Sequence, residues 1–251
     1  MSLPPCPSVI SVLIHPVSSA PSVSSPSTIA LVHQQIVSCT RCRRLRTYCA
    51  RVAREKKRAH ADDEYWGRPV PGFGDPQARV LVLGLAPAAH GANRTGRVFT
   101  GDGSGDFLMR ALFETGFASI PTSRRADDGL VLTDAYIAAA VRCAPPDNKP
   151  LPAEIAACRR HLDAEWAALP RVRVIVALGR IAFDAALALL ARAASPVRPR
   201  PPFAHGAVCA PPGLPVLMAS YHPSRQNTNT RRLTPDMLRT VFERARAELI
   251  G

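Results

Sequence analysis

The sequence predicts a three-layer α/β/α fold in which helices cover both faces of a central, mainly parallel four-stranded sheet. Short apolar runs bounded by Gly and Pro alternate with longer segments of helical periodicity, which is typical of a parallel sheet with crossover helices. These apolar runs are nearly continuous, as expected for strands buried on both faces. A chain of 251 residues is long enough to enclose one full core of this kind.

The elements follow in order along the chain. Two helices separated by a cysteine-containing turn are expected within 29–60. Strands are expected at 80–83, 135–141, 172–178 and 214–220, and further helices at 107–117, 150–168, 180–193 and 235–249. Residues 1–27 are rich in Ser and Pro and almost uncharged, so we expect a disordered tail there and a single domain over 28–251.

Charge and cysteine content narrow the class of protein. A net charge of +13 predicts an anionic partner, with DNA or RNA favoured over a membrane surface, although a solvated basic face is an alternative. No apolar run reaches the roughly 20 residues of a membrane span, and the first 22 residues lack the basic start of a secretory signal. We therefore expect a cytoplasmic protein, associated with the nucleoid if bacterial. In a reducing compartment, seven cysteines favour metal binding over disulfides.

A long polar loop follows the first strand. Gly84 ends the strand and lets the backbone turn, and ligands of open α/β sheets bind at the carboxyl ends of strands. The loop carries many side chains that could serve a site: Pro87, His90, Asn93, Arg94, Arg97, Phe99 and Asp102. The alternative is a mobile surface loop, which Gly and Asn also favour. The density of functional groups favours a site.

Three motifs carry a resemblance to a known family. They are GLAPAAHGANRTGRVFTGD at 84–102, VRCAPPDNKP at 141–150 and HPSRQNTNT at 222–230. In this order they resemble the uracil-DNA glycosylase superfamily, most closely its family 5, the broad-specificity iron-sulfur members called type B. The resemblance covers the chain from about Cys39 to the C-terminus. It implies a monofunctional DNA repair glycosylase that flips uracil or another deaminated base, such as hypoxanthine, out of DNA and hydrolyses its N-glycosidic bond, leaving an abasic site.

The resemblance also implies roles for single residues. Asp102 and Asn148 match positions that activate water, and His222 matches the one that stabilises the departing base. Base stacking on Phe99 is expected. The implied substrate-binding set is Gly84, Ala86, Pro87, Ala88, Phe99 and His222, and the DNA-binding set is Arg94, Arg97, Ser224, Arg225, Gln226 and Asn227. Taken singly, Asp102 could instead be a turn residue, Asn148 a loop cap and Phe99 a core side chain. The expected partner is double- or single-stranded DNA containing deaminated bases, bound by a monomer.

Four cysteines are candidates for a metal centre. Cys39 and Cys42 form a C-x2-C pair, and Cys143 and Cys158 could complete a four-thiolate set. Spacing does not separate zinc from iron-sulfur, and Cys158 could simply be a core residue. The resemblance implies a four-iron four-sulfur cluster on these four cysteines, with Cys49 as the residue that could replace one of them.

Two positions depart from the narrower family 4. Leu85 stands where that family has a Glu, and Ala139 where it has an Asn that reads the uracil edge. The resemblance therefore implies a more permissive pocket. Two rival functions are a nucleotide-binding hydrolase or transferase and a catalytically silent DNA-binding protein. The usual phosphate-binding motifs are missing, which disfavours the first, and the presence of Asp102 and His222 disfavours the second.

Overall fold

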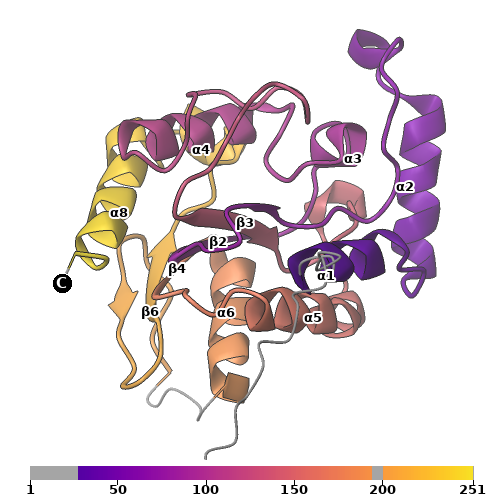
Figure 1. The fold of residues 1–251 in the computed structure, drawn as a ribbon. Coiled ribbons are helices and arrows are strands. Elements are labelled where there is room, and N and C mark those ends of the chain that lie inside the picture. The colour runs from indigo at the N-terminus through magenta and orange to yellow at the C-terminus, as the bar shows by residue number, and fades with distance from the viewer. Residues whose placement is uncertain (1–27, 194–199, 251) are drawn as a thin grey trace, which may run out of the picture.

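A computed structural model describes residues 28–193 and 200–250. The predicted tail at 1–27 lies outside these residues, so the tail and the single-domain assignment stay predictions. The sheet order is β1-β3-β2-β4-β6-β5 (Figure 1). Its four central strands are parallel: β3 (Ala135–Ala139), β2 (Val80–Gly84), β4 (Val174–Leu178) and β6 (Val216–Ser220). The predicted fold class is confirmed.

Two edge strands were not predicted. β1 (Phe73–Gly74) pairs antiparallel with β3, and β5 (Val208–Cys209) pairs antiparallel with β6. Each has only two residues, which is too short for a period to show in the sequence. They extend the predicted four-stranded sheet to six strands.

Helices cover both faces of the sheet. Their bounds are α1 Thr28–Val37, α2 Arg43–Glu55, α3 Ala92–Thr95, α4 Gly103–Glu114, α5 Pro152–Ala167, α6 Arg180–Ala193, α7 Arg225–Asn229 and α8 Pro235–Ala247, with short 3-10 turns η1 Arg58–His60 and η2 Pro146–Asn148. Among the described residues, none of these helices is both long and apolar enough to cross a membrane.

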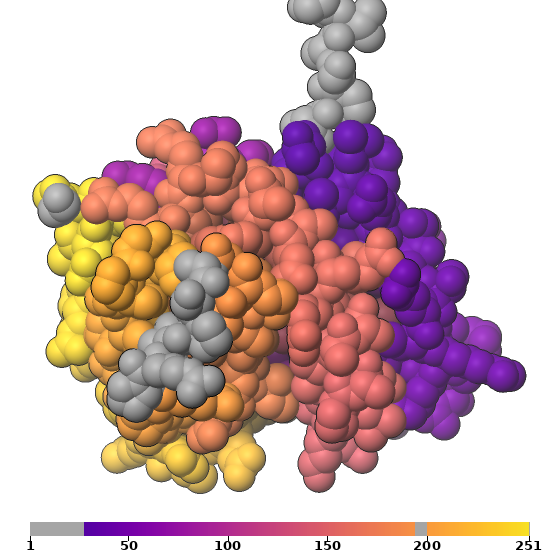
Figure 2. Space-filling view, turned by 90° about the horizontal axis from the view of Figure 1, so that it is seen from below, coloured from indigo at the N-terminus to yellow at the C-terminus, as the bar shows by residue number. Residues whose placement is uncertain are grey.

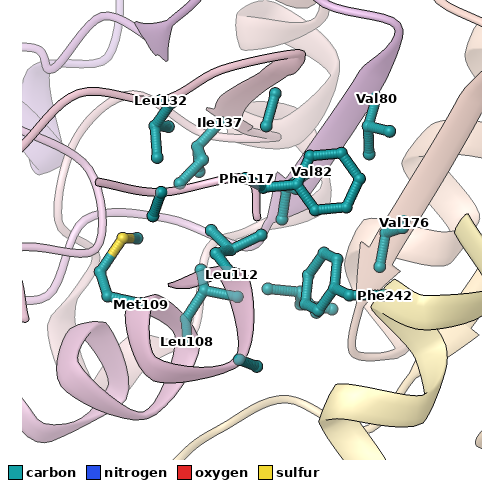
Figure 3. Close-up of a cluster of buried hydrophobic side chains, with 14 of the residues drawn as sticks. Val80, Val82, Leu108, Met109, Leu112, Phe117, Leu132, Ile137, Val176 and Phe242 are labelled. Carbon is teal, nitrogen blue, oxygen red and sulfur yellow. The ribbon is translucent and has the colours of Figure 1, made fainter. Parts of the chain in front are cut away.

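Successive side chains of a strand point to opposite faces of the sheet, so each face packs against a different set of helices. Val80 and Val82 of β2 point into a core shared with Leu112 of α4 and Phe242 of α8 (Figure 3). Residues Leu81 and Leu83 point the other way, into a core shared with α5 and α6. Figure 2 shows that second face, with α5 and α6 in salmon to orange beside the indigo N-terminal helices. The sheet is therefore buried on both sides, as the apolar runs predicted.

The helix predicted at 107–117 begins four residues earlier, at Gly103. Asp102 caps it, because its carboxylate Oδ1 accepts hydrogen bonds from the backbone N–H of Ser104 (2.9 Å) and Gly105 (3.0 Å). This cap satisfies N–H groups that a helix leaves without partners. It allows a Gly-rich first turn that helix propensity alone disfavours.

Candidate active site

The carboxyl ends of the parallel strands bring the first and last motifs together. β2 ends at Gly84 and leads into the loop that carries Phe99, and β6 ends at Ser220 and leads into His222. The rings of Phe99 and His222 lie 5.9 Å apart between centroids, at 30° to each other. Two predicted site residues that are 123 positions apart in sequence therefore form one wall.

Glycines make room for this wall. A Cβ at Gly84 would lie 2.6 Å from Cε2 of Phe99, and one at Gly179, directly after β4, would lie 3.2 Å from Cβ of His222. Phe99 itself has a φ of 49°, a left-handed conformation that is costly for an aromatic residue. Strain of this kind persists where the surrounding structure holds it, commonly at functional sites.

Asp102 has one carboxylate oxygen to spare. Oδ1 is used by the helix cap, whereas Oδ2 accepts no hydrogen bond from the described residues. Oδ2 lies so close to the backbone of the preceding loop that a Cβ at Gly91 would come within 2.0 Å of it. Burial raises the pKa of Asp102, and the two backbone N–H donors and Arg225 only partly offset this effect. Asp102 is thus both a helix cap and a partly desolvated carboxylate facing the loop.

His222 is neutral at ordinary pH. Burial lowers its pKa to about 4, because the surrounding protein disfavours the charged imidazolium. The segment that follows is fixed locally: Ser224 caps α7, and the side-chain amide of Asn227 donates to the backbone oxygen of His222 at 2.9 Å. A neutral imidazole still carries one N–H, so it can donate a hydrogen bond without bringing a charge.

The last motif, 222–230, presents two exposed side chains, of which Arg225 lies near Asp102. Arg225 and Gln226 begin α7 and are exposed. Nε of Arg225 lies 3.9 Å from the position that a Cβ would occupy at Gly103, and its charge lowers the pKa of Asp102. The other two predicted DNA-binding residues of this motif make hydrogen bonds within the protein. Ser224 caps α7, and Asn227 holds the backbone at His222.

Asn148 is not brought to Asp102 by any contact in the described chain. It is exposed at the end of η2, with a φ of 57°, and its side chain makes no hydrogen bond to the described residues. Its predicted role in holding water therefore stays a prediction.

Arg97 requires a correction, because its guanidinium is not available to a phosphate. It is buried, donates to both carboxylate oxygens of Asp128 at 2.8 Å and to Oγ1 of Thr100 at 2.9 Å, and lies 4.9 Å from the centroid of the Phe73 ring. A side chain with its donors satisfied inside the protein cannot bind DNA without breaking that network. The prediction that Arg97 binds DNA is contradicted by these contacts.

Arg94 is likewise committed within the protein. Its guanidinium donates to Asp63 (2.7 Å), to the backbone oxygen of Gly101 (2.9 Å) and to that of His90 (2.9 Å). The side chain is only 11% exposed. Both arginines thus stabilise the loop through hydrogen bonds inside the protein. This does not agree with the DNA-binding role predicted for them.

The rest of the predicted substrate-binding set lies in the same loop. The backbone oxygen of Ala88 accepts from the N–H groups of Gly91 (3.2 Å) and Asn93 (3.0 Å), and Pro87 is buried. Ala86 packs against the cluster of buried cysteines. The cysteines therefore support the loop from behind, although they are distant from it in sequence.

Sequence reasoning missed two supports of this loop. Asn93 is fully buried and its side-chain amide donates to the backbone oxygens of Cys49 and Ala89, both at 3.4 Å. Tyr65 places its hydroxyl 3.0 Å from Nδ1 of His90. Asn93 stands inside the first motif and could have been assigned this role, whereas Tyr65 and Asp128 carry no signal in the sequence.

Three of the four candidate metal ligands gather around one buried cluster. The fourth, Cys39, is half-buried and is one of the groups that raise the pKa of Cys42. Cys143 and Cys158 are buried in the cluster, Cys42 packs against it, and the charges of these thiols influence one another's pKa values. Burial raises the pKa of Cys158 to about 12, and the backbone N–H of Arg142 donates to its Sγ at 3.2 Å. Cys49 also belongs to the cluster, beside Cys143.

In the part of the chain that the structure describes, no three His, Cys, Asp or Glu side chains converge closely enough to hold a single metal ion. A four-iron cluster is larger than one ion and keeps its thiolates further apart. Cys143 and Cys158 are buried whereas Cys39 and Cys42 are half-buried, and four thiolates are a donor set that can hold either zinc or an iron-sulfur cluster.

Comparison with known proteins decides the family. The model of the "Uracil DNA glycosylase superfamily" matches residues 71–246. The chain belongs to the uracil-DNA glycosylase superfamily. It is 52% identical over 213 residues to a type-5 uracil-DNA glycosylase of Thermus thermophilus, covering 85% of this chain and 94% of the relative. It is 48% identical over 220 residues to the type-5 uracil-DNA glycosylase of Mycobacterium tuberculosis, covering 87% and 81%.

A type-4 uracil-DNA glycosylase of Pyrobaculum aerophilum is 33% identical over 132 residues, which cover 52% of this chain and 59% of the relative. The greater likeness to type-5 members agrees with the resemblance read from the motifs. This member of the superfamily is a DNA glycosylase, an enzyme of DNA repair that hydrolyses N-glycosidic bonds, as predicted.

Proposed function

We propose that this enzyme removes uracil, and also hypoxanthine, from DNA by flipping the damaged nucleotide into the site at the strand ends. The observation that carries the proposal is the pairing of Phe99 with His222 at the carboxyl edge of one parallel sheet, with Asp102 and its spare oxygen in the same loop as Phe99. These groups supply a stacking surface, a neutral hydrogen-bond donor and a carboxylate. Those are the three elements that departure of a base from deoxyribose requires.

Charge development on the substrate assigns the roles. Positive charge grows on the sugar as the bond breaks, so Asp102 stabilises it and orients a water through Oδ2. Negative charge grows on the leaving base, which accepts a hydrogen bond from His222. Because the pKa of His222 is about 4, it acts as a neutral donor. Asn148 approaches the same water in this proposal, which requires the exposed segment 146–148 to close over the bound nucleotide.

The environment of Ala139 supports the broad specificity. Ala139 is buried and lies opposite Gly84 in the register of the parallel strands, at the floor of the site. Ala139 carries no side-chain amide. A purine bound here would therefore leave no protein hydrogen-bonding group without a partner at this position. Loss of such a reader weakens discrimination more than loss of an apolar contact does.

The four cysteines Cys39, Cys42, Cys143 and Cys158 would hold a four-iron four-sulfur cluster. When bound, the cluster would link the start of α2 to the segment after β3 and to α5, behind the loop of the first motif. Its proposed role is structural, because the site residues lie on the other side of that loop. We further propose that the enzyme acts as a monomer on double- and single-stranded DNA. Its cytoplasmic location stays a prediction.

Excision on labelled oligonucleotides tests the function. Duplexes containing a single uracil or hypoxanthine, and the matching single strands, are incubated with purified enzyme and then cleaved with alkali at abasic sites. Strand cleavage on both bases, with no product from undamaged DNA, supports the proposal. Cleavage at uracil alone would contradict the permissive pocket, and cleavage without alkali would contradict the monofunctional assignment.

A further inference from the structure

Helix α2 has two different faces. One face carries Leu45, Cys49 and Val52, which are buried at the spacing of successive turns. The other face forms the wall of a groove of about 490 Å³ that α2 shares with η2. The groove is lined by Arg43, Arg44, Thr47, Tyr48, Arg51 and Pro146. Apart from Pro146, which belongs to the segment 146–148, none of these residues belongs to the site described above.

Of the three arginines in the groove, two have no carboxylate within hydrogen-bond distance among the residues that the structure describes. Arg44 is committed, because it donates to both carboxylate oxygens of Glu154 at 2.8 Å. Arg51 is 54% exposed and stays 4.0 Å from the carboxylate of Glu55, beyond hydrogen-bond distance. Arg43 is exposed and makes no ion pair with the residues that the structure describes. The groove therefore presents two solvated guanidinium groups.

Between these charges the groove is apolar. Tyr48 and Pro146 provide flat surfaces, and the guanidinium of Arg51 lies 5.5 Å from the centroid of the Tyr48 ring. An aromatic surface flanked by arginines suits a sugar-phosphate strand, since phosphates pair with guanidinium groups and sugars or bases pack on rings. An entirely apolar partner would leave Arg43 and Arg51 desolvated without partners.

The position of the groove connects it with the active site. The strand order runs β3-β2-β4-β6, with Arg225 and Gln226 after the end of β6 and Pro146 after the end of β3. Three inter-strand steps span roughly 15 Å, which is about four base-pair steps of duplex DNA. α2 packs against α3 of the first-motif loop and lies at the outer end of this line (Figure 1).

We infer that the groove between α2 and η2 is a second DNA-binding surface, which holds the phosphodiester backbone flanking the flipped nucleotide. DNA runs along the carboxyl edge of the sheet, from α7 at one end to α2 at the other. Arg43 and Arg51 bind successive phosphates, and Tyr48 contacts the intervening sugar. This inference rests on the proposed function only in taking DNA as the substrate, since the groove binds backbone and not the damaged base.

The test compares a double variant, Arg43→Ala with Arg51→Ala, with a control of equal charge loss. The control, Arg171→Ala with Arg192→Ala, removes two exposed arginines before β4 and at the end of α6, away from the carboxyl edge. The first readout is the salt dependence of binding to an undamaged duplex, measured by fluorescence anisotropy. The groove variant should bind about tenfold more weakly and lower the salt slope by about 2, whereas the control should do neither.

The second readout uses hairpin-closed duplexes with uracil and flanks of about 3 or about 10 base pairs. Because the groove lies beyond roughly four base-pair steps, the groove variant should lose affinity for the long-flank duplex and not for the short one. Equal losses in the groove variant and the control would overturn the inference, as would an unchanged salt slope. Loss of the visible absorbance of the cysteine centre would also overturn it, by showing that these arginines serve that centre.

The first readout stays informative if the enzyme fails to excise uracil, because it uses undamaged DNA. Failure of the proposed function and failure of this inference are therefore distinguishable. Tyr48→Phe and Tyr48→Ala add a check on the apolar wall. The Phe variant should keep the affinity that the Ala variant loses.

Discussion

Asp102 joins two duties at one residue. As the N-cap of α4 it uses Oδ1, and as the proposed catalytic carboxylate it uses Oδ2. Asn can also accept the two backbone hydrogen bonds of the cap, because Asn and Asp are similarly good N-caps. Asp102→Asn therefore separates the charge from the cap without removing the side chain.

We expect Asp102→Asn to reduce single-turnover excision of uracil on the order of a hundredfold or more, while DNA affinity and thermal stability change little. The control is Asp106→Asn, which removes a neighbouring exposed carboxylate of the same helix. The pH profile gives a second check. Since burial raises the pKa of Asp102, wild-type excision should fall as acidification protonates it, and the variant should lack this limb. A variant within a few fold of wild type would shift the catalytic role to Asn148 and His222.

In the proposed site, Ala139 broadens specificity because it carries no side-chain amide. We expect Ala139→Asn to raise the ratio of uracil to hypoxanthine excision, because an amide at this floor position can read the uracil edge and clash with a purine. The buried site is tight, so stability should fall by about 1–3 kcal/mol. Ala139→Leu, which has the same branched arrangement of side-chain heavy atoms but is apolar and somewhat larger, is the control. If both variants change the ratio equally, volume and not hydrogen bonding sets the specificity.

At the scale of elements, the short helix α7 is built to hold two exposed side chains beside the site. We expect Arg225→Ala together with Gln226→Ala to slow excision from paired DNA, with a smaller effect on single strands, because only a duplex leaves a gap when a base is flipped. Single-turnover rates on uracil opposite guanine and on the single strand measure the difference. Equal effects on the two substrates would argue against a wedge. Thr230→Ala, at the end of α7, is a control that leaves both side chains in place.

The loop of the first motif is held by the ion pair of the buried Arg97 and the half-buried Asp128. Burial favours the neutral acid, but the hydrogen bonds from Arg97 and three backbone N–H groups outweigh it and lower the pKa of Asp128 to about 2. A carboxyl whose pKa is depressed on folding stabilises the protein above its unfolded pKa, and this contribution is lost as the pH falls through the folded value.

We therefore expect Asp128→Asn to lower the free energy of unfolding by about 2 kcal/mol at neutral pH, with the difference from wild type shrinking between about pH 4 and pH 2. Denaturant unfolding at several pH values measures this. The control is Asp127→Asn, which removes the adjacent carboxylate of an exposed ion pair. A difference that is independent of pH would show that the pair does not act through its charge.

At the scale of the whole molecule, the cysteine centre connects three separate segments. We expect the purified protein to be brown and to contain about four irons per chain, with visible absorbance that is lost on reduction or chelation. Replacement of Cys143 or Cys158 by Ala should lower the yield of folded protein before it lowers catalysis. Cys209→Ala, outside the cluster, is the control. Stoichiometric zinc without iron would contradict the cluster, and normal iron in Cys143→Ala would transfer the ligand role to Cys49.

The sequence by itself determined the fold class, the order in which the parallel strands and the helices follow one another along the chain, and the family. The reason is that these depend on local periodicity and on contiguous motifs, as at 80–84 and 222–230. It could not determine which polar groups face inward. The motif predicted that Arg94 and Arg97 bind phosphates. In the structure they form ion pairs with Asp63 and Asp128, which come from distant segments.

Only the tertiary structure decided the composition of the site, because a site is made of contacts between segments that are remote in sequence. It set Phe99 against His222, left Oδ2 of Asp102 without a hydrogen-bond partner among the described residues, and exposed Asn148 to solvent. It also brought the groove of α2 to the same edge of the sheet as α7. Helical periodicity predicts that α2 has a basic face, but chain topology alone decides what lies beside that face.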